Sequence, residues 1–284
     1  MSGLSGVAGG VTAVTGPGKG SGKTTLLNAL LPLARKAGPV GLFSVGVDGA
    51  LKAGERARAA EVRVEEGDVV LTTDRFARAS SARLEVLEAL EGRTVLGRLL
   101  LGRAVRRGEV TLVGAESVGA LAGAVALARS ERWAASCLVD GAASRLTQVG
   151  ALAGARFVYT VRVDRGNLAR LAEELRALVA LAELPVSPEP AAGALRVEGP
   201  LTEEARDRPP SPAPPLSLED FTKLFLPPRE LLRLLASVPC SLRRGFPLLG
   251  VVASLRDVTR EELEAAAGPS VAPHLLGNPY EVAA

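Results

Sequence analysis

The residues best suited to chemistry lie together in one short segment, Gly16 to Thr25, with the sequence Gly-Pro-Gly-Lys-Gly-Ser-Gly-Lys-Thr-Thr. Glycines allow positive φ angles, so successive main-chain N–H groups can point into one concavity that holds an anion. A lysine and a hydroxyl group at the end of such a loop are the groups that contact terminal phosphates and Mg²⁺. The segment therefore predicts a loop that binds a polyphosphate.

The segment matches the pattern G-x-x-x-x-G-K-[ST] from Gly22 onward. At the place of the first glycine the chain has Pro17, and Gly16 lies one residue further back, so the loop is one residue longer than usual. In this interpretation Lys23 reaches the β- and γ-phosphates, and the hydroxyl group of Thr24 binds Mg²⁺. The predicted nucleotide-binding residues are Gly16, Gly18, Lys19, Gly20, Ser21, Gly22, Lys23, Thr24 and Thr25.

Acidic residues that follow predicted strands are candidates to act beside this loop. Asp140 ends the apolar run 136–139 and is the best candidate for the second Mg²⁺ ligand, the Walker-B role. Asp48 follows strand 40–45 and is a candidate to bind the metal through water or to position the attacking water. Glu116 follows another strand and is a candidate to face the same crevice. Ligands of open α/β sheets bind beyond the carboxyl ends of strands, which makes these acids a coherent set. The predicted catalytic residues are Lys23, Asp48 and Glu116, and the predicted metal ligands are Thr24 and Asp140.

The elements on each side of the loop are those that such a loop requires. Residues 10–15 are rich in β-branched side chains and predict a strand. Residues 25–36 place leucines at helical spacing and predict a helix, whose amino terminus would add N–H donors and a positive dipole end. A flexible Gly/Ser turn without a ligand is the alternative, and this strand–loop–helix context counts against it.

The rest of the chain predicts alternating strands and helices. The predicted strands are 40–45, 68–73, 94–101, 109–113, 136–140 and 157–163, and the predicted helices are 75–90, 118–128 and 168–184. The Arg106-Arg107-Gly108 turn suggests a hairpin between 94–101 and 109–113. The alternation predicts an α/β fold of the P-loop NTPase type, with a mostly parallel sheet and helices on both faces.

A Pro-rich stretch divides the chain. Residues 185–215 hold nine of the 19 prolines and predict a loop or linker after a P-loop NTPase domain formed by residues 1–184. Beyond it, residues 216–284 predict a helix at 229–237, a strand at 248–253 and a helix at 259–267. We expect this short segment to dock on the main domain rather than to fold alone.

Composition argues against several classes of protein. Apolar residues make up 47% of the chain and aromatic residues 3%, which favours an α/β core of Ala, Val and Leu. The net charge of +3, the absence of a basic run and the few aromatic residues argue against binding DNA or RNA. Cys137 and Cys240 stand apart in apolar sequence, as reduced core thiols do. No signal peptide or membrane span is visible, so we expect a cytoplasmic protein.

The nucleotide base is predicted from the absence of a motif. Guanine-specific proteins end a strand with Asn/Thr-Lys-x-Asp, whereas the nearest segment here, Val161-Arg162-Val163-Asp164, has neither the amide nor the lysine. ATP with Mg²⁺ is therefore favoured over GTP.

Several segments together resemble one family. The loop of residues 16–25 resembles the Gly-x-Ala-Lys-Asn-Ala-Gly-Lys-Thr-Thr loop of the reactivating ATPase of lysine 5,6-aminomutase and ornithine 4,5-aminomutase. Residues 44–49 resemble its Ser-Ile-Gly-x-Asp-Gly segment, and residues 94–97 together with 108–114 resemble its hairpin-like middle. Asp140-Gly141-Ala142 with Arg145 resembles its Asp-Gly-Ala-x-x-Arg, and residues 220–225 resemble a motif of its tail. The chain departs from the family at 159–162, where the family has a small Thr-Gly-Ala strand end.

The resemblance implies a function and partners. Proteins of this family work with a second, larger ATPase subunit that resembles MutS, and together they exchange damaged cobalamin on an aminomutase for intact adenosylcobalamin, at the expense of ATP. The resemblance thus implies an ATP-dependent reactivase subunit. The chain has no Asp-x-His-x-x-Gly cobalamin loop and no pyridoxal-phosphate signature, so we expect it to bind neither cofactor itself.

Three other interpretations stay open. A small-molecule kinase or an ATP-dependent ligase similar to dethiobiotin synthetase would need substrate-anchoring residues, which the sequence does not reveal. A cofactor-insertion GTPase is disfavoured because Cys/His clusters and the guanine motif are missing. A non-enzymatic module with a structural nucleotide is the third.

Overall fold

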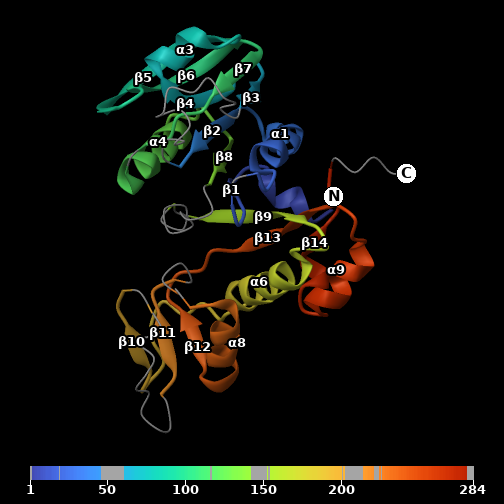
Figure 1. Cartoon of the computed structure of the whole chain (residues 1–284). Coiled ribbons are helices and arrows are strands. Elements are labelled where there is room, and N and C mark those ends of the chain that lie inside the picture. The colour runs from blue at the N-terminus through green and yellow to red at the C-terminus, as the bar shows by residue number, and fades with distance from the viewer. Residues whose placement is uncertain are drawn as a thin grey trace. The chain divides into compact units, whose positions relative to one another are not determined.

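The computed structural model describes residues 2–18, 20–45, 61–115, 117–141, 152, 154–199, 201, 214–220, 224 and 226–279. The chain forms two compact units (Figure 1). The first contains Met1–Thr160 and Gly277–Ala284, and the second contains Val161–Leu276.

The first unit is built on a large, mostly parallel sheet, in which the strand order is β9-β1-β8-β2-β4-β6-β5. Its strands are β1 (Val11–Thr15), β2 (Val40–Ser44), β4 (Val69–Thr73), β5 (Arg83–Thr94), β6 (Gly97–Arg106), β8 (Ser136–Asp140) and the first part of β9 (Ala155–Val163). β1 pairs in parallel with β8 and β9, and β2 with β8 and β4, whereas β6 runs antiparallel to both neighbours. The predicted α/β fold with a mostly parallel sheet is confirmed.

Helices cover both faces of this sheet. Figure 1 shows α1 (Lys23–Ala34) and α4 (Val118–Ser130) on opposite sides of β1, β8 and β2. All five residues of β1 are buried, as expected of a strand covered on both faces. The hydroxyl group of Ser136 donates to the carbonyl of Ala34 in α1 at 2.8 Å. Side chains alternate along a strand, so Asp140, four residues after Ser136, also faces α1.

The predicted helix at 75–90 is wrong beyond its first turns. The helix α3 spans only Asp74–Ala79, and the following residues form β5. Glutamates and leucines in 84–91 recur every three residues, which imitates a helix. In the structure β5 pairs with β6 over its whole length. Shifts of register, such as that between Val86 and Glu88, accommodate apolar residues that do not alternate with polar ones as in a regular strand. Tertiary pairing thus overrides the local pattern.

The predicted hairpin between 94–101 and 109–113 is also wrong. β6 pairs with β4 and β5, while β7 (Gly108–Thr111) pairs with β3 (Glu61–Val64) in a separate two-stranded sheet. The glycine that suggested a turn has a different role: a Cβ on Gly108 would lie 2.3 Å from the main-chain nitrogen of Ala82. Gly108 is therefore required by a close backbone approach.

The second unit contains a small sheet of its own. Its elements are α6 (Leu168–Ala182), β10 (Leu195–Val197), β11 (Leu216–Leu218), α8 (Pro228–Ser237), β12 (Cys240–Leu242), β13 (Leu248–Leu255), α9 (Arg260–Ala267) and β14 (Leu275–Leu276). Strands β10, β11 and β12 form a three-stranded parallel sheet, and β13 pairs with β14. The helix α6 packs against α8 and α9. The predicted helices at 168–184, 229–237 and 259–267 and the strand at 248–253 are confirmed.

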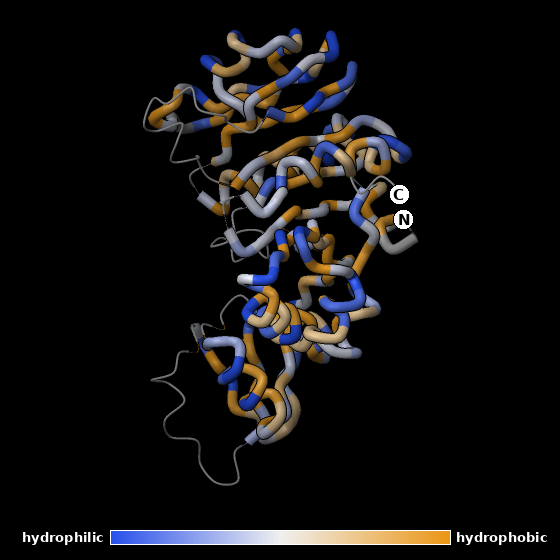
Figure 2. Tube along the Cα trace, turned by 45° about the vertical axis from the view of Figure 1, so that its right-hand side comes forward, coloured by the Kyte–Doolittle hydropathy of each residue, from blue (hydrophilic) through white to orange (hydrophobic). Residues whose placement is uncertain are grey.

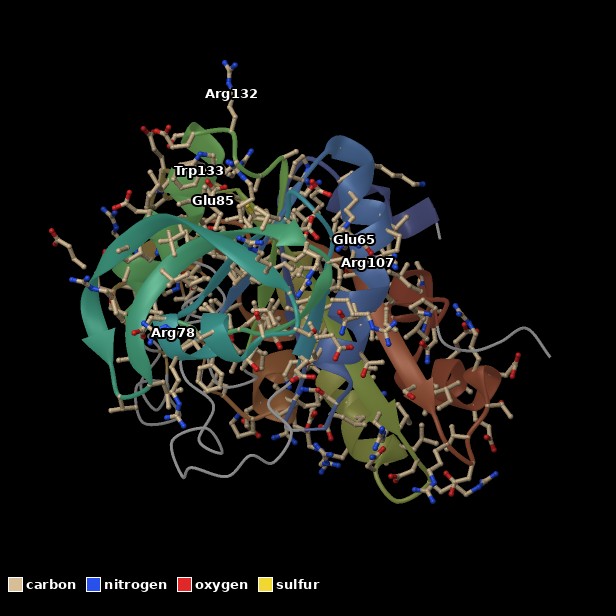
Figure 3. The ribbon with its side chains drawn as sticks, turned by 90° about the horizontal axis from the view of Figure 1, so that it is seen from above. Glu65, Arg78, Glu85, Arg107, Arg132 and Trp133 are labelled. Atoms are coloured by element: carbon tan, nitrogen blue, oxygen red, sulfur yellow. The ribbon has the colours of Figure 1, made fainter. Side chains whose placement is uncertain are left out.

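Apolar and polar segments alternate along the coloured parts of the tube in Figure 2. Among the described residues, no helix combines the length and the apolar character needed to cross a membrane. Charged side chains extend outward, as Arg132 does in Figure 3 from the turn between α4 and β8.

Cys137 and Cys240 are buried and free, and burial raises the pKa of their thiols to about 12 and about 11. Both cysteines thus remain protonated parts of the core.

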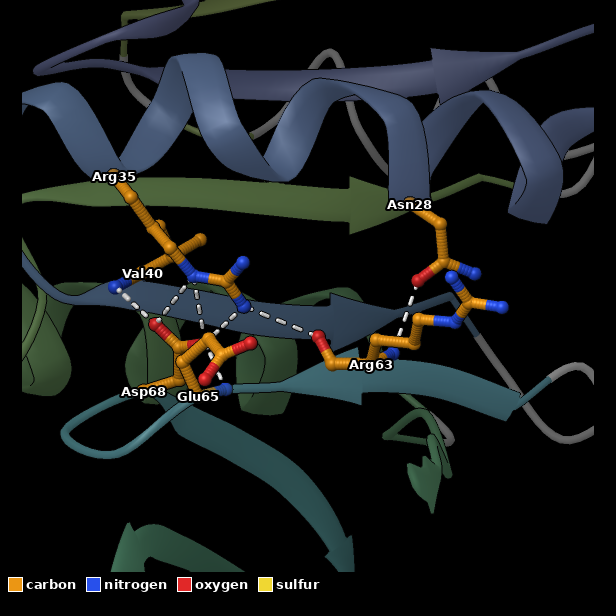
Figure 4. A network of polar contacts seen from close by, with 6 residues as sticks. All are labelled: Asn28, Arg35, Val40, Arg63, Glu65 and Asp68. Atoms are coloured by element: carbon orange, nitrogen blue, oxygen red, sulfur yellow. Dashed lines mark hydrogen bonds and ion pairs between the residues drawn. The ribbon is translucent and has the colours of Figure 1, made fainter. Parts of the chain in front are cut away.

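The far end of α1 is anchored by one buried carboxylate, that of Asp68 (Figure 4). This side chain accepts hydrogen bonds from Arg35 Nε at 3.1 Å and from the main-chain N–H groups of Val40 at 3.1 Å and Glu65 at 2.9 Å. Asn28, in the middle of α1, is bonded to the main-chain N–H of Arg63 in β3 at 2.9 Å. These contacts fix α1 against the starts of β2 and β4 and against β3.

We expect Asp68→Ala to lower the free energy of unfolding by about 3 kcal/mol, because it leaves Arg35, the buried N–H of Val40 and the N–H of Glu65 without their acceptor. The matched control is Arg63→Ala: the Arg63 side chain is 79% exposed and lies 3.7 Å from Glu109. That change should alter stability by less than about 0.5 kcal/mol. Urea unfolding of both variants measures the difference, and equal losses would show that the buried network adds nothing.

Candidate functional site

The loop between β1 and α1 is held by contacts among its own residues. The hydroxyl group of Ser21 donates to the carbonyl of Gly18 at 3.0 Å. The ammonium group of Lys23 donates to the same carbonyl at 2.6 Å and contacts Ser21 Oγ at 3.2 Å. Gly20 and Gly22 have φ angles of 82° and 91°, which favour glycine. The loop thus has a defined shape, with Lys23 lying back over it.

The loop leads directly into α1. Gly22 is the N-cap residue, with φ 91° and ψ 13°, and makes no side-chain cap hydrogen bond. The first regular helical bond runs from the N–H of Leu26 to the carbonyl of Gly22 at 2.8 Å. The first turn contains no acidic residue, so the positive end of the helix dipole is not neutralised from within that turn. This end of α1 is therefore suited to an anion.

The electrostatics of Lys23 agree with this. Burial lowers the pKa of its ammonium group, and the negative charge of Asp140 partly opposes that effect. The cation is thus partly dehydrated and held mainly by a neutral carbonyl and a hydroxyl group. A negatively charged ligand at this place would compensate the lost hydration.

Thr24 and Asp140, 116 positions apart in the sequence, are brought into contact here. The hydroxyl group of Thr24 donates to Asp140 Oδ2 at 3.1 Å. Asp140 ends β8, opposite Val14 of β1, and its carbonyl accepts the N–H of Val45 at 2.9 Å. A carboxylate beside a hydroxyl group is an oxygen pair of the kind that Mg²⁺ accepts.

These two residues alone do not complete a metal site. Within the described ranges, no group of three or more His, Cys, Asp or Glu side chains could hold a metal ion. An ion bound at Thr24 and Asp140 would therefore need further oxygens from water or a phosphate. Mg²⁺ commonly binds in that way, so the pair fits it.

Thr160 contributes to the loop and was missed by the sequence interpretation. It belongs to β9, is 3% exposed, and donates from its hydroxyl group to the carbonyl of Ser21 at 3.0 Å. Its own carbonyl oxygen lies 2.3 Å from the place that a Cβ on Gly16 would take. A hydroxyl group in a buried strand signals that a hydrogen-bond partner must exist. The sequence does not reveal that the partner is the loop.

The other predicted residues fall into two groups. Gly16, Gly18, Gly20, Ser21, Gly22, Lys23, Thr24 and Thr25 form the loop and the first turn of α1, with Asp140 beside them. Lys19, Asp48, Glu116 and Arg145 lie outside the described residues. The described chain stops at Val45, three residues before Asp48, and at Ala115, directly before Glu116. Val45 and Ala115 form a parallel bridge.

Comparisons with models of protein families, with curated proteins and with solved structures found no match. The chemistry of this site is therefore inferred from its own residues. They provide a cation, a hydroxyl group beside a carboxylate, and a helix end that favours anions.

The glycines of the loop offer a matched pair of substitutions. A Cβ on Gly16 would lie 2.3 Å from the Thr160 carbonyl and 2.7 Å from Ser21 Oγ, whereas a Cβ on Gly18 would meet nothing within 4 Å. We expect Gly16→Ala to destabilise the protein by roughly 1–3 kcal/mol. Gly18→Ala should stay within about 0.5 kcal/mol of the wild type. Thermal unfolding tests this, and equal effects would contradict the close packing of Gly16 on Thr160.

Proposed function

We propose that this chain is a Mg²⁺-dependent P-loop ATPase that binds the terminal phosphates of ATP between residues 16 and 25. The observation that supports this most is the contact of Thr24 with Asp140 beside Lys23. Glycine loops also occur as plain turns, but a turn gives no reason for a distant acid to meet the second residue of the helix. A nucleotide with its metal gives such a reason.

Each residue then has a role. The loop N–H groups and the start of α1 hold the phosphates, and Lys23 turns from the Gly18 carbonyl to the β- and γ-phosphates. Thr24 and Asp140 would hold Mg²⁺, whose charge, when bound, offsets the negative charge of the phosphates. Asp48 and Glu116 are proposed to position the attacking water.

ATP is preferred to GTP in this proposal. The carboxylate of Asp164, in the segment nearest to a guanine motif, accepts the N–H of Asn167 at 3.0 Å. The N–H of Asp164 in turn donates to the Asn167 side chain at 3.0 Å. Asp164 is thus engaged in the turn that starts α6, and the choice of ATP is supported by the missing Asn/Thr-Lys-x-Asp motif.

The direct test is calorimetry of the whole chain with MgATP and MgGTP, followed by measurement of phosphate release. We expect Lys23→Ala to weaken MgATP binding roughly 10- to 100-fold, the loss of a charge-assisted bond of about 1.5–3 kcal/mol, and to stop turnover. Lys36→Ala, which removes an exposed cation beyond α1, is the control and should bind as the wild type does. Absence of binding by the wild-type chain would overturn the proposal.

A second variant tests the metal separately. Asp140→Asn keeps an oxygen that accepts from Thr24 but removes the negative charge. We expect the Mg²⁺ concentration for half-maximal turnover to rise at least roughly tenfold, as when metal sites are perturbed. Binding of ATP in the presence of a chelator should change little. An unchanged Mg²⁺ dependence would exclude Asp140 as a metal ligand.

We propose further that this ATPase acts as a reactivase subunit, with a MutS-like ATPase partner, on an adenosylcobalamin-dependent aminomutase. The support is the resemblance to that family of residues 16–25, 44–49, 94–97, 108–114 and 140–142 with Arg145. The test is co-purification with both partners in MgATP, followed by measurement of cobalamin release. Turnover stimulated by a small metabolite would instead indicate a kinase or ligase, and tight binding without turnover a structural nucleotide.

A further inference from the structure

We infer that Thr160 is a positioning residue that holds the loop in the shape that receives phosphate, an inference that rests on the proposed nucleotide site. Thr160 lies on β9, which pairs with β1 in a register that sets Thr15 opposite Tyr159. Thr160 is the next residue of β9, so it lies beside the point where β1 ends and the loop begins. It is 3% exposed and 139 positions from the residue that it binds.

Thr160 meets the loop at both of its ends. Its carbonyl oxygen occupies the space beside Gly16, where a Cβ would approach to 2.3 Å. Its hydroxyl group donates to the carbonyl of Ser21 at 3.0 Å and lies 3.7 Å from the place of a Cβ on Gly22. One strand residue therefore fixes where the loop begins and where it turns into α1.

The hydrogen bond to Ser21 has a consequence for the next N–H group. In a planar trans peptide, the C=O and the N–H point in opposite directions. Because Thr160 draws the Ser21 carbonyl toward β9, the N–H of Gly22 must point away from β9. Such oriented N–H groups are what a phosphate-binding nest consists of.

The contacts that Lys23 makes with the loop cannot do this once a phosphate is bound. Lys23 holds the Gly18 carbonyl and contacts Ser21 Oγ, but it has to leave both groups to reach a phosphate. The bond from Thr160 involves only a hydroxyl group and a main-chain carbonyl, so it can persist in the bound state. Thr160 is thus a support of the loop that does not depend on the ligand.

The test compares Thr160→Val, which keeps the branched shape but lacks the hydroxyl group, with Thr160→Ser, which keeps it. The binding of MgATP and of inorganic pyrophosphate to the whole chain is measured by calorimetry. We expect Thr160→Val to weaken both roughly tenfold, the size expected for one hydrogen bond. Thr160→Ser should bind within about threefold of the wild type. A merely structural hydroxyl group would alter the melting temperature and leave both affinities unchanged.

The outcomes separate this inference from the proposed function. If the wild-type chain binds neither MgATP nor pyrophosphate, the proposed function fails and the inference fails with it. If the wild type binds but Thr160→Val binds equally well, or Thr160→Ser loses as much as Thr160→Val, only the inference fails. Should Thr160→Val not fold, the N–H signal of Gly22 in Thr160→Ser is followed by NMR on addition of pyrophosphate. A shift as in the wild type supports the role, and no shift overturns it.

Discussion

The parallel pairing of β1 with β8 is the constraint on which the candidate site depends. It places Val14 opposite Asp140, so the loop that follows β1 and the acid that ends β8 emerge at one edge of the sheet. A register shift of one residue would turn Asp140 to the other face, away from α1. A shift of two residues would move it by about 6.6 Å and break its contact with Thr24. The site is therefore a property of strand register as much as of the loop.

The helix α1 connects the candidate site to the rest of the first unit. Its first turn carries Lys23 and Thr24, its middle is bonded through Asn28 to β3, and Arg35 just past its end meets Asp68. A rigid element fixed at both ends keeps a functional group in place better than a loop does. The loop itself contributes glycines, and its Ser21 carbonyl accepts a hydrogen bond from the hydroxyl group of Thr160.

Much of the scaffold could be predicted from local pattern because its signals are local. The run that became β1 is rich in β-branched residues, the run that became β8 is mostly apolar, and the loop carries its own motif. β5 failed because leucines and glutamates spaced by three residues favour a helix, and only its partner β6 makes it a strand. The role of Thr160 was missed for a related reason, because no residue near it in the sequence indicates that Ser21 is its hydrogen-bond partner. The roles of Lys19, Asp48 and Glu116 stay predictions.

β9 belongs to both compact units. Its residues Ala155–Thr160 lie in the first and Val161–Val163 in the second, where the carbonyl of Val163 accepts the N–H of Arg256 at 2.9 Å. A chain terminated at the boundary between the units would end inside β9, with Thr160 as its last residue. Fraying of that new terminus would weaken the contact of Thr160 with the loop. Truncations meant to isolate the first unit should therefore keep β9 intact, and loss of function in a shorter fragment would not show that the second unit takes part in the candidate site.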